Sequence, residues 1–481
     1  MPELYGALRP FGEKDFEKLH LSTLSLLEKT GVYADNEEVL EYARKAGHKV
    51  DMENKTIRFD SAIVEKNIRT ASHSLDRREP PENLIFSCDG GTGHVHEYGT
   101  NKRRDATERD IADFCRLVDA LPNIDEVSLP LYTRDVPYEI MDLTIFRQVW
   151  ANTAKSGGGG LSRNTGALFN NTPDALEYLR RLARIRYGAD QKPDGTPLIS
   201  SFVGASSPLR FDGTVLESML CLVRMGQVSG IGSNVIAGVQ GPASLAGVVV
   251  MENAERLALL SMLMAVDPDA WFYFCNHPNY LDMVMGTTAN GSPEHSLMAM
   301  CATGLLRHYG FQLMANHPCL TTASNMPGIQ PAAEKAVHAL LTGLTGASGV
   351  SVCGGLFEAM SYEQLVIDNE IAGMVKHLLR GMDVNDDTIH LDVMEDLGIG
   401  ANFLEHECVA EDARKYYWKP ELWNRRSYSD WQKNDGRDIM EKAHEKVCDI
   451  LENHHPKPLT DMQEAEMDEL IKEARAVLLK S

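Results

Sequence analysis

Residues 197–241, PLISSFVGASSPLRFDGTVLESMLCLVRMGQVSGIGSNVIAGVQG, decide the fold. A short apolar segment at 197–205 is followed by an amphipathic helical stretch and then by a second apolar segment at 234–241. Strand–helix–strand units of this kind favour parallel pairing, because the helix returns the chain to the same end of the sheet. The segment therefore predicts an α/β protein with a parallel sheet.

The same alternation continues on both sides of this segment. Eight short apolar segments alternate with helical stretches over residues 125–400, which is typical of a closed (β/α)8 TIM barrel. An open doubly wound sheet is the alternative, but no Gly-x-Gly-x-x-Gly turn follows the first predicted strand. The predicted strands are 126–132, 154–162, 197–205, 234–241, 270–276, 311–317, 349–355 and 388–393.

Mainly helical extensions flank the predicted barrel. In the N-terminal part, two helices are expected to end at Gly31 and Gly47, and Thr107 is expected to cap a third helix. After the barrel the composition shifts to clustered Trp, Tyr and His, followed by a final helix. The expected division is an N-terminal helical and mixed extension at 1–124, a barrel catalytic domain at 125–400 and a C-terminal helical extension at 401–481.

Composition limits the classes of partner. Of the 481 residues, 43% are hydrophobic and 24% charged, and the net charge is −22. A surface this acidic repels phosphate backbones, so nucleic acid is not an expected partner. The nine cysteines show no Cys-x-x-Cys spacing, which indicates a reducing compartment rather than a disulfide framework. No signal peptide and no apolar run of about 20 residues are present, so we expect a cytoplasmic protein.

Active sites of TIM barrels lie at the carboxyl ends of the strands. The predicted strands therefore select polar and aromatic candidates without any motif. No Gly-x-Ser-x-Gly elbow is present, and no catalytic residue can be identified from the sequence. The residues expected at these strand ends are Tyr132, Ser162, Arg163, Ser206, Ser207, Gln240, Asn276, His277, His317, Phe357 and Glu358.

A zinc site at the strand ends is a rival hypothesis. Cys-Asn-His-Pro at 275–278 and Asn-His-Pro-Cys at 316–319 end consecutive predicted strands, and Cys353 ends the next. Zinc accepts such ligands, but the spacing matches no zinc signature, and buried cysteines also pack as small hydrophobic residues. We therefore expect no bound metal.

Aromatic residues near the predicted strand ends indicate a site for a cation. Tyr98, Tyr132, Phe272, Phe274 and Phe357 could each offer a ring face. A quaternary ammonium cannot donate a hydrogen bond, so proteins bind it with aromatic rings. The alternative is that each ring belongs to the hydrophobic core.

Several long segments resemble the trimethylamine:corrinoid methyltransferase family, in its branch without pyrrolysine. The resemblance runs from about Tyr98 to His455. The segment 315–335 departs from the pattern of the pyrrolysine branch. The most specific matches are AGVQGPASLAG (237–247), ENAERLALL (252–260), GSPEHSLMAM (291–300), SYEQLVIDNEIAGMVKHLLRGMDV (361–384) and NFLEHECVAEDARKYYWKPELWNRRSYSDW (402–431).

The resemblance implies a (β/α)8 barrel that moves a methyl group from a small amine to Co(I) of cobalamin carried by a cognate corrinoid protein. The enzyme would hold no tight cofactor of its own, would be a homo-oligomer, and would serve methylotrophy or methanogenesis. Without pyrrolysine, the expected substrate is a quaternary amine, with glycine betaine first. A zinc-dependent barrel methyltransferase and a non-catalytic betaine-binding or regulatory protein are the alternatives.

Residues at the predicted strand ends are expected to bind such a substrate. Phe357 and Tyr98 would face the trimethylammonium group by cation–π attraction. The carboxylate of a betaine loses its water on entry and needs donors, because an unpaired buried charge is costly. The expected donors are His317, Arg163 and Gln240, and Glu358 lies next to Phe357 in the sequence.

Overall fold

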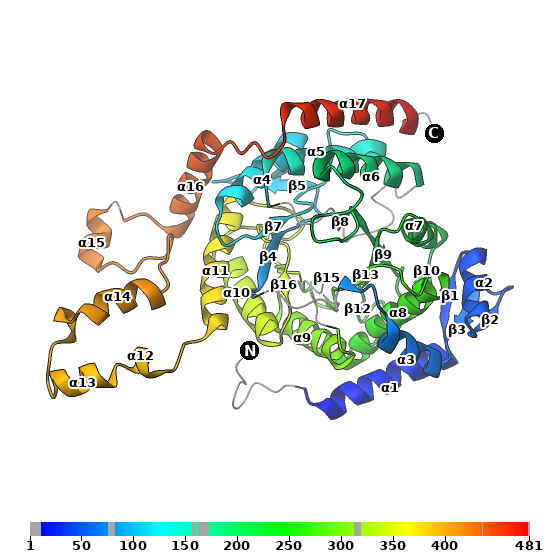
Figure 1. Cartoon of the computed structure of the whole chain (residues 1–481), viewed down its shortest axis with the longest axis horizontal. Coiled ribbons are helices and arrows are strands. Elements are labelled where there is room, and N and C mark those ends of the chain that lie inside the picture. Colours follow the sequence, from blue (N-terminus) through cyan, green and yellow to red (C-terminus); the bar gives the residue numbers. More distant parts are fainter. Residues whose placement is uncertain are drawn as a thin grey trace.

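The computed structural model describes residues 11–75, 82–155, 160–161, 173–311, 319–434 and 436–479. Short strands lie at the centre of the main body and long helices surround them, while a group of helices near the C-terminus extends away from it (Figure 1). The protein is therefore a mixed α/β structure. Within the described ranges, no helix combines the length and apolar character that a membrane span requires.

One parallel sheet occupies part of the centre. Its order is β13-β11-β9-β8, and every neighbouring pair is parallel. The predicted strands 197–205 and 270–276 are confirmed in β9 and β13, whereas 154–162 contributes only β8 among its described residues. The four strands are β8 (Gly160–Leu161), β9 (Ser200–Gly204), β11 (Val228–Ser233) and β13 (Phe272–Asn276).

The predicted strand 234–241 is wrong. The chain forms its long strand earlier, in β11, and the predicted segment holds only the two-residue β12 (Ile236–Ala237) before it turns at Gly238, where φ is +82°. A Cβ added at Gly230 would lie 2.7 Å from the Tyr273 ring, so this glycine makes room for an aromatic neighbour. Because β11 contains several small residues, an apolar sequence pattern does not predict it as a strand.

A second parallel sheet has the order β16-β4-β7. Its central strand, β4 (Ile85–Cys88), comes from the strand-like part of the expected N-terminal extension. The other two, β7 (Glu126–Val127) and β16 (Gly349–Val350), are the beginnings of the predicted strands 126–132 and 349–355. No closed sheet is formed by the described strands, so the expected closed barrel is not seen in them.

Two further predicted strands have different outcomes. The strand expected at 388–393 is wrong, because this segment is helical in α12 (Asp386–Ile389) and α13 (Leu391–Leu397). The Asn385 side chain caps α12 by accepting from the Thr388 N–H at 3.1 Å. The strand expected at 311–317 lies outside the described residues, except for Phe311, which is not in a strand.

Eight helices follow one another around the central strands (Figure 1). The predicted N-cap at Thr107 is confirmed, and its backbone N–H donates to Asp110 at 2.8 Å. The helices are α4 (Glu108–Ala120), α5 (Met141–Asn152), α6 (Pro173–Tyr187), α7 (Gly213–Arg224), α8 (Leu245–Val266), α9 (Pro293–His308), α10 (Ile329–Leu344) and α11 (Tyr362–Arg380).

The N-terminal segment packs against α8. Its first two helices stop before Gly31 and Gly47, as predicted, and both glycines have the positive φ that favours this residue type. The Asn253 amide on α8 donates to the Thr23 hydroxyl at 3.0 Å. The segment consists of α1 (Glu13–Lys29), α2 (Glu37–Lys45) and α3 (Ser61–Thr70), with β1 (Val32–Ala34), β2 (Lys49–Asp51) and β3 (Thr56–Arg58) joined to β10 (Arg210–Phe211).

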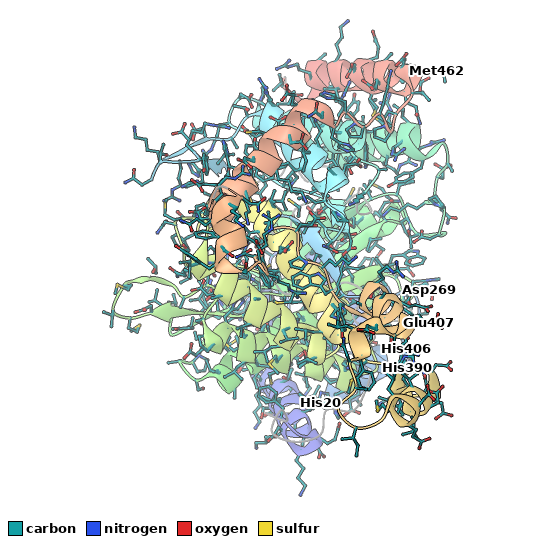
Figure 2. All side chains as sticks on the ribbon, turned by 90° about the vertical axis from the view of Figure 1, so that its left-hand side faces the viewer. His20, Asp269, His390, His406, Glu407 and Met462 are labelled. Carbon is teal, nitrogen blue, oxygen red and sulfur yellow. The ribbon has the colours of Figure 1, made fainter. Side chains whose placement is uncertain are left out.

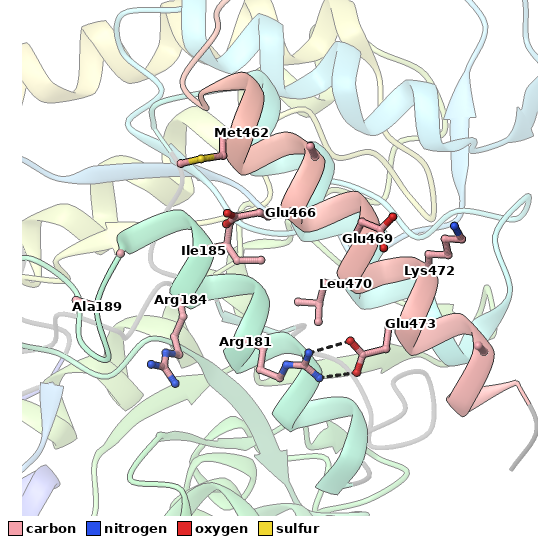
Figure 3. A pocket seen from close by; sticks show the side chains of 13 residues that line it. Arg181, Arg184, Ile185, Ala189, Met462, Glu466, Glu469, Leu470, Lys472 and Glu473 are labelled. Atoms are coloured by element: carbon pink, nitrogen blue, oxygen red, sulfur yellow. Dashed lines mark hydrogen bonds and ion pairs between the residues drawn. The ribbon is translucent and has the colours of Figure 1, made fainter.

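The C-terminal helices α16 and α17 pack on the main body, and the other C-terminal helices extend from it (Figure 1). The last helix, α17, lies on α6, where Arg181 makes two 2.9 Å hydrogen bonds to Glu473 beside the buried Leu470 (Figure 3). The remaining elements are α14 (Glu407–Tyr416), α15 (Tyr428–Lys433), α16 (Ile439–Asn453) and α17 (Asp461–Leu478).

A buried ion pair joins α10 to α11 behind the end of β16. Lys335 Nζ lies 2.6 Å from Asp368 Oδ2, and both side chains are almost fully buried. The second Asp368 oxygen accepts from the Gln364 amide at 2.7 Å. A buried pair of this kind contributes little net stability, but loss of one partner leaves an uncompensated charge in a low-dielectric interior.

Lys335→Met should lower the free energy of unfolding by about 3–5 kcal/mol, because Asp368 would stay buried without its cation. Arg181→Ala breaks the exposed pair with Glu473 and is the matched control, with an expected loss below about 1 kcal/mol. Urea unfolding of both variants measures the difference. Equal losses would contradict the structural role of the buried pair.

Candidate functional site

The chain turns sharply at the carboxyl end of β16. Val352 has φ +68°, which is rare for a β-branched residue, and its carbonyl accepts from Lys335 Nζ at 3.3 Å. The Gly354 N–H donates to Asp368 at 2.6 Å, and the Cys353 N–H donates to the Ser87 carbonyl next to it in β4. Strained backbone conformations of this kind cluster at functional sites, so this turn is a candidate.

Three loops meet beside this turn. The hairpin of β5 (His94–His96) and β6 (Arg103–Asp105) approaches the loop that follows β16, and the His96 N–H donates to the Met360 carbonyl at 2.8 Å. The third loop precedes α10 and contains Ser324, whose carbonyl accepts from the Phe357 N–H at 2.8 Å. Backbone bonds therefore hold these loops together at the carboxyl ends of β4 and β16.

His96, Met326 and Phe357 are the side chains that these loops bring to the site, and we call them the mouth wall. His96 Nε2 lies 3.3 Å from Met326 Sδ. Met326 is 42% exposed, and Phe357 is partly exposed and belongs to no aromatic ring pair among the described residues. A thioether and a phenyl ring provide a polarisable surface of the kind that binds methyl groups of an organic cation.

Glu358 and Tyr98 lie within two of these loops. Glu358 follows Phe357, has φ +55°, and faces Arg103 at 3.7 Å with most of its carboxylate side chain exposed. Tyr98 lies in the β5–β6 hairpin, where its ring stacks on His444 with centroids 3.6 Å apart and planes inclined by 4°. One face of the Tyr98 ring is therefore covered by an imidazole.

The three expected donors are not all described. Gln240 follows β12, and its side-chain oxygen accepts from the Ile236 N–H at 3.0 Å, so this oxygen closes a turn of its own loop. Arg163 and His317 lie outside the described residues. Gln240 is thus placed by local hydrogen bonding rather than by contact with the mouth wall.

Buried carboxylates on α8 hold the ends of other strands. Glu252 accepts from the His277 N–H at 2.9 Å, just after β13. Glu255 accepts from the Leu209 N–H and the Ser207 hydroxyl, both at 2.7 Å, in the loop that follows β9. Burial raises the pKa of Glu252 to about 7 and also raises the pKa of Glu255. Both carboxylates therefore hold loops in place, while their burial disfavours the charged form.

A group of histidines packs behind the end of β13. The ring of His295 stacks on His338 with centroids 4.8 Å apart and meets His277 at 5.6 Å. Burial lowers the pKa of His338 to about 4 and that of His295 well below its usual value. Burial therefore disfavours the charged form of both imidazoles.

Of the strand-end cysteines that the rival zinc hypothesis would use, Cys275 and Cys353 are buried and Cys319 is partly buried. Burial raises the pKa of the Cys353 thiol well above its usual range, which disfavours the thiolate that zinc requires. Over the described part of the chain, three metal-ligand atoms lie within 4.8 Å of one another only in the C-terminal group of His390, Cys408 and Asp412. The described strand-end cysteines and histidines do not form such a group.

Sequence reasoning missed His96 and Met326. His96 lies in a hairpin that the sequence analysis assigned to the N-terminal extension, and a single methionine carries no binding signature. The positive φ of Val352 also has no sequence signal, because valine usually indicates regular strand. If the strand-like segment that contains β4 is taken as a central strand, His96 is expected near the carboxyl end of that strand.

Glu252→Gln should flatten the pH dependence of stability. A raised pKa contributes stability that is present below the ordinary value of 4.5 and is lost as the pH rises through about 7, a change of about 3 kcal/mol for a shift of this size. Denaturant unfolding between pH 4.5 and 8 checks this, with the exposed Glu469→Gln as control. A Glu252→Gln profile as steep as that of the parent would show that Glu252 does not titrate this way.

Comparison with known proteins identifies the family. The sequence profile described as trimethylamine methyltransferase (MTTB) matches residues 3–478. The trimethylamine methyltransferase MttB of Methanosarcina thermophila is 29% identical, over 95% of this chain and 96% of that protein. The glycine betaine methyltransferase of Desulfitobacterium hafniense (strain Y51) is 27% identical, over 95% of each chain. The solved Methanosarcina barkeri monomethylamine methyltransferase (MtmB) is 12% identical, with a TM-score of 0.44 over 93% of this chain and 90% of that chain. The family match and the two sequence relatives confirm the resemblance found in the sequence: the chain belongs to the trimethylamine methyltransferase family and is a methyltransferase.

Proposed function

We propose that this methyltransferase moves a methyl group from a small quaternary amine, with glycine betaine as the first candidate, to the cobalt of a corrinoid carried by a partner protein. The observation that carries the proposal is family membership along nearly the whole chain, with a glycine betaine methyltransferase among the relatives. The sequence contains only standard residues and departs from the pyrrolysine branch at 315–335. Both features favour a quaternary over a tertiary amine.

The chemistry of such a substrate suits the described site. The carbon–nitrogen bond breaks with its electrons on nitrogen, so the leaving group departs as a neutral tertiary amine and no general acid is required. The partner's corrinoid supplies the nucleophile that receives the methyl group. The residues of this chain then have one main task, which is to orient a single methyl group for in-line attack.

The mouth wall is the part of the site that we assign to the trimethylammonium group. Phe357 offers a ring face, and Met326 offers a polarisable sulfur from the loop whose Ser324 carbonyl accepts from the Phe357 N–H. Tyr98 could add only its second face, because the first is stacked on His444. His317, Arg163 and Gln240 remain the proposed donors to the carboxylate of a betaine, and Glu358 remains a proposed neighbour of the site.

We also infer that the two parallel sheets belong to one eight-stranded (β/α)8 barrel. The Val127 N–H of β7 donates to the Lys155 carbonyl at 3.0 Å, shortly before β8, which supports a join between the sheets on one side. On the other side, Cys319 forms a parallel bridge with Ser351, just after β16. Closure would need one more strand between β13 and β16; the strand predicted at 311–317 lies outside the described residues apart from Phe311.

A panel of amines with reduced cobalamin as methyl acceptor tests the proposal. Glycine betaine should be demethylated, whereas the tertiary amine dimethylglycine should react far more slowly, because its leaving group is a poorer one without protonation. Methylated cobalamin measured from the visible spectrum gives both rates. Comparable rates with tertiary and quaternary amines would contradict the assignment.

Phe357→Ala should weaken glycine betaine binding about two- to thirty-fold, because it removes a cation–π contact worth roughly 0.5–2 kcal/mol. Phe357→Tyr keeps the ring and should bind like the parent. Since Phe357 is partly exposed, its truncation should cost less stability than Phe274→Ala in the core, for which about 3–5 kcal/mol is expected. Calorimetric titration and thermal melting of the three variants check this. Unchanged affinity in folded Phe357→Ala would remove the residue from the site.

A further inference from the structure

The segment 381–421, which we call the arm, has no buried residue. It extends from the main body (Figure 1), and its helices α12, α13 and α14 contain only 4, 7 and 10 residues. Isolated helices shorter than about 12–15 residues are marginal in water. Chains of this size that cannot build a core usually depend on a cross-link, a metal or a partner. Something other than a hydrophobic core must therefore hold the arm together.

Metal-ligating side chains converge at one place in the arm. His390, at the junction of α12 and α13, has φ +51°, and its Nε2 lies 2.7 Å from Asp412 Oδ2 on α14. Cys408 lies one helical turn before Asp412 and therefore on the same face of α14. The ligand atoms of all three residues lie within 4.8 Å of one another. The group thus joins the two halves of the arm.

We propose that His390, Cys408 and Asp412 bind a structural Zn²⁺ ion, with water in the fourth position. Imidazole nitrogen, thiolate sulfur and carboxylate oxygen are the ligand types that tetrahedral zinc takes, at about 2.0–2.3 Å. From the sequence we expect no bound metal, because the candidate ligands considered there are at the strand ends; this group lies in the arm.

A neighbouring histidine caps the helix that carries the thiol. His406 Nδ1 lies 3.1 Å from Cys408 Sγ and accepts from the Cys408 N–H at 3.3 Å, so His406 caps α14 and fixes its first turn. His390 and His406 lie on the same part of the arm (Figure 2). Groups that orient a metal ligand in this way commonly change metal affinity about 10- to 100-fold when they are removed. His406 is therefore a positioning residue of the zinc site.

Metal analysis of the untagged full-length protein tests the proposal. After loading with zinc chloride and dialysis, the parent should retain one Zn²⁺ per chain. His390→Ala and Cys408→Ser should each lower zinc affinity more than about 100-fold, because they remove a ligand rather than an orienting group. Cys448→Ser is the matched control, since Cys448 is an exposed cysteine 3.6 Å from His444 and should keep full zinc binding.

Two further measurements distinguish loss of the zinc site from a general loss of structure in the variants. Co²⁺ in place of zinc should give a thiolate-to-metal charge-transfer absorption in the parent and in Cys448→Ser, but not in Cys408→Ser. Zinc should also slow hydrogen exchange at 386–416 in the parent while leaving the body unchanged. No zinc above trace in the loaded parent, or unchanged zinc affinity in a folded Cys408→Ser, would overturn the proposal. Methyl transfer is not needed for any of these measurements.

Discussion

The carboxylate of Asp368 connects the helical layer to the end of a central strand. It holds Lys335 at 2.6 Å and also accepts from the Gly354 N–H, so one buried group joins α10, α11 and the turn after β16. That turn contains Val352 in a conformation that is costly for valine. A strained turn persists only where its surroundings over-determine it, and the buried ion pair does so here. The position of Phe357, five residues later, depends on this constraint.

The same arrangement recurs around the main body. Glu252 and Glu255 on α8 accept backbone N–H groups after β13 and β9, and Asp125 accepts from the Phe86 N–H at 2.7 Å while binding Lys376. Carboxylates in these places satisfy buried donors at the strand ends, where regular pairing stops. The loops after β13 and β9 are thereby fixed to α8, and the start of β4 is fixed to the segment before β7. A methyl group must be held in line with its acceptor, so a rigid site serves this chemistry better than a mobile one.

The sequence was informative where local rules decide the structure. The helix ends near Gly31 and Gly47 and the cap at Thr107 follow from φ preference and hydrogen bonding within a few residues. It failed where tertiary packing decides, as in β11, whose glycines leave room for aromatic neighbours, and at 388–393, where capping by Asn385 outweighs a β-like composition. For the site, Phe357 and Glu358 were predicted from strand-end geometry, and their role stays a prediction. His96 and Met326 were not predicted, because their contact depends on a hairpin whose partners lie far along the chain.

The central claim is that a methyl group leaves a quaternary amine for cobalt without a proton donor from the protein. Glycine betaine carrying ¹³C-labelled methyl groups, mixed with the protein and reduced cobalamin, tests it most directly. Equal amounts of labelled methylcobalamin and dimethylglycine are expected, formed at a rate that does not follow the titration of any protein group near neutral pH. Consumption of glycine betaine without labelled methylcobalamin, or no reaction with any quaternary amine, would contradict it.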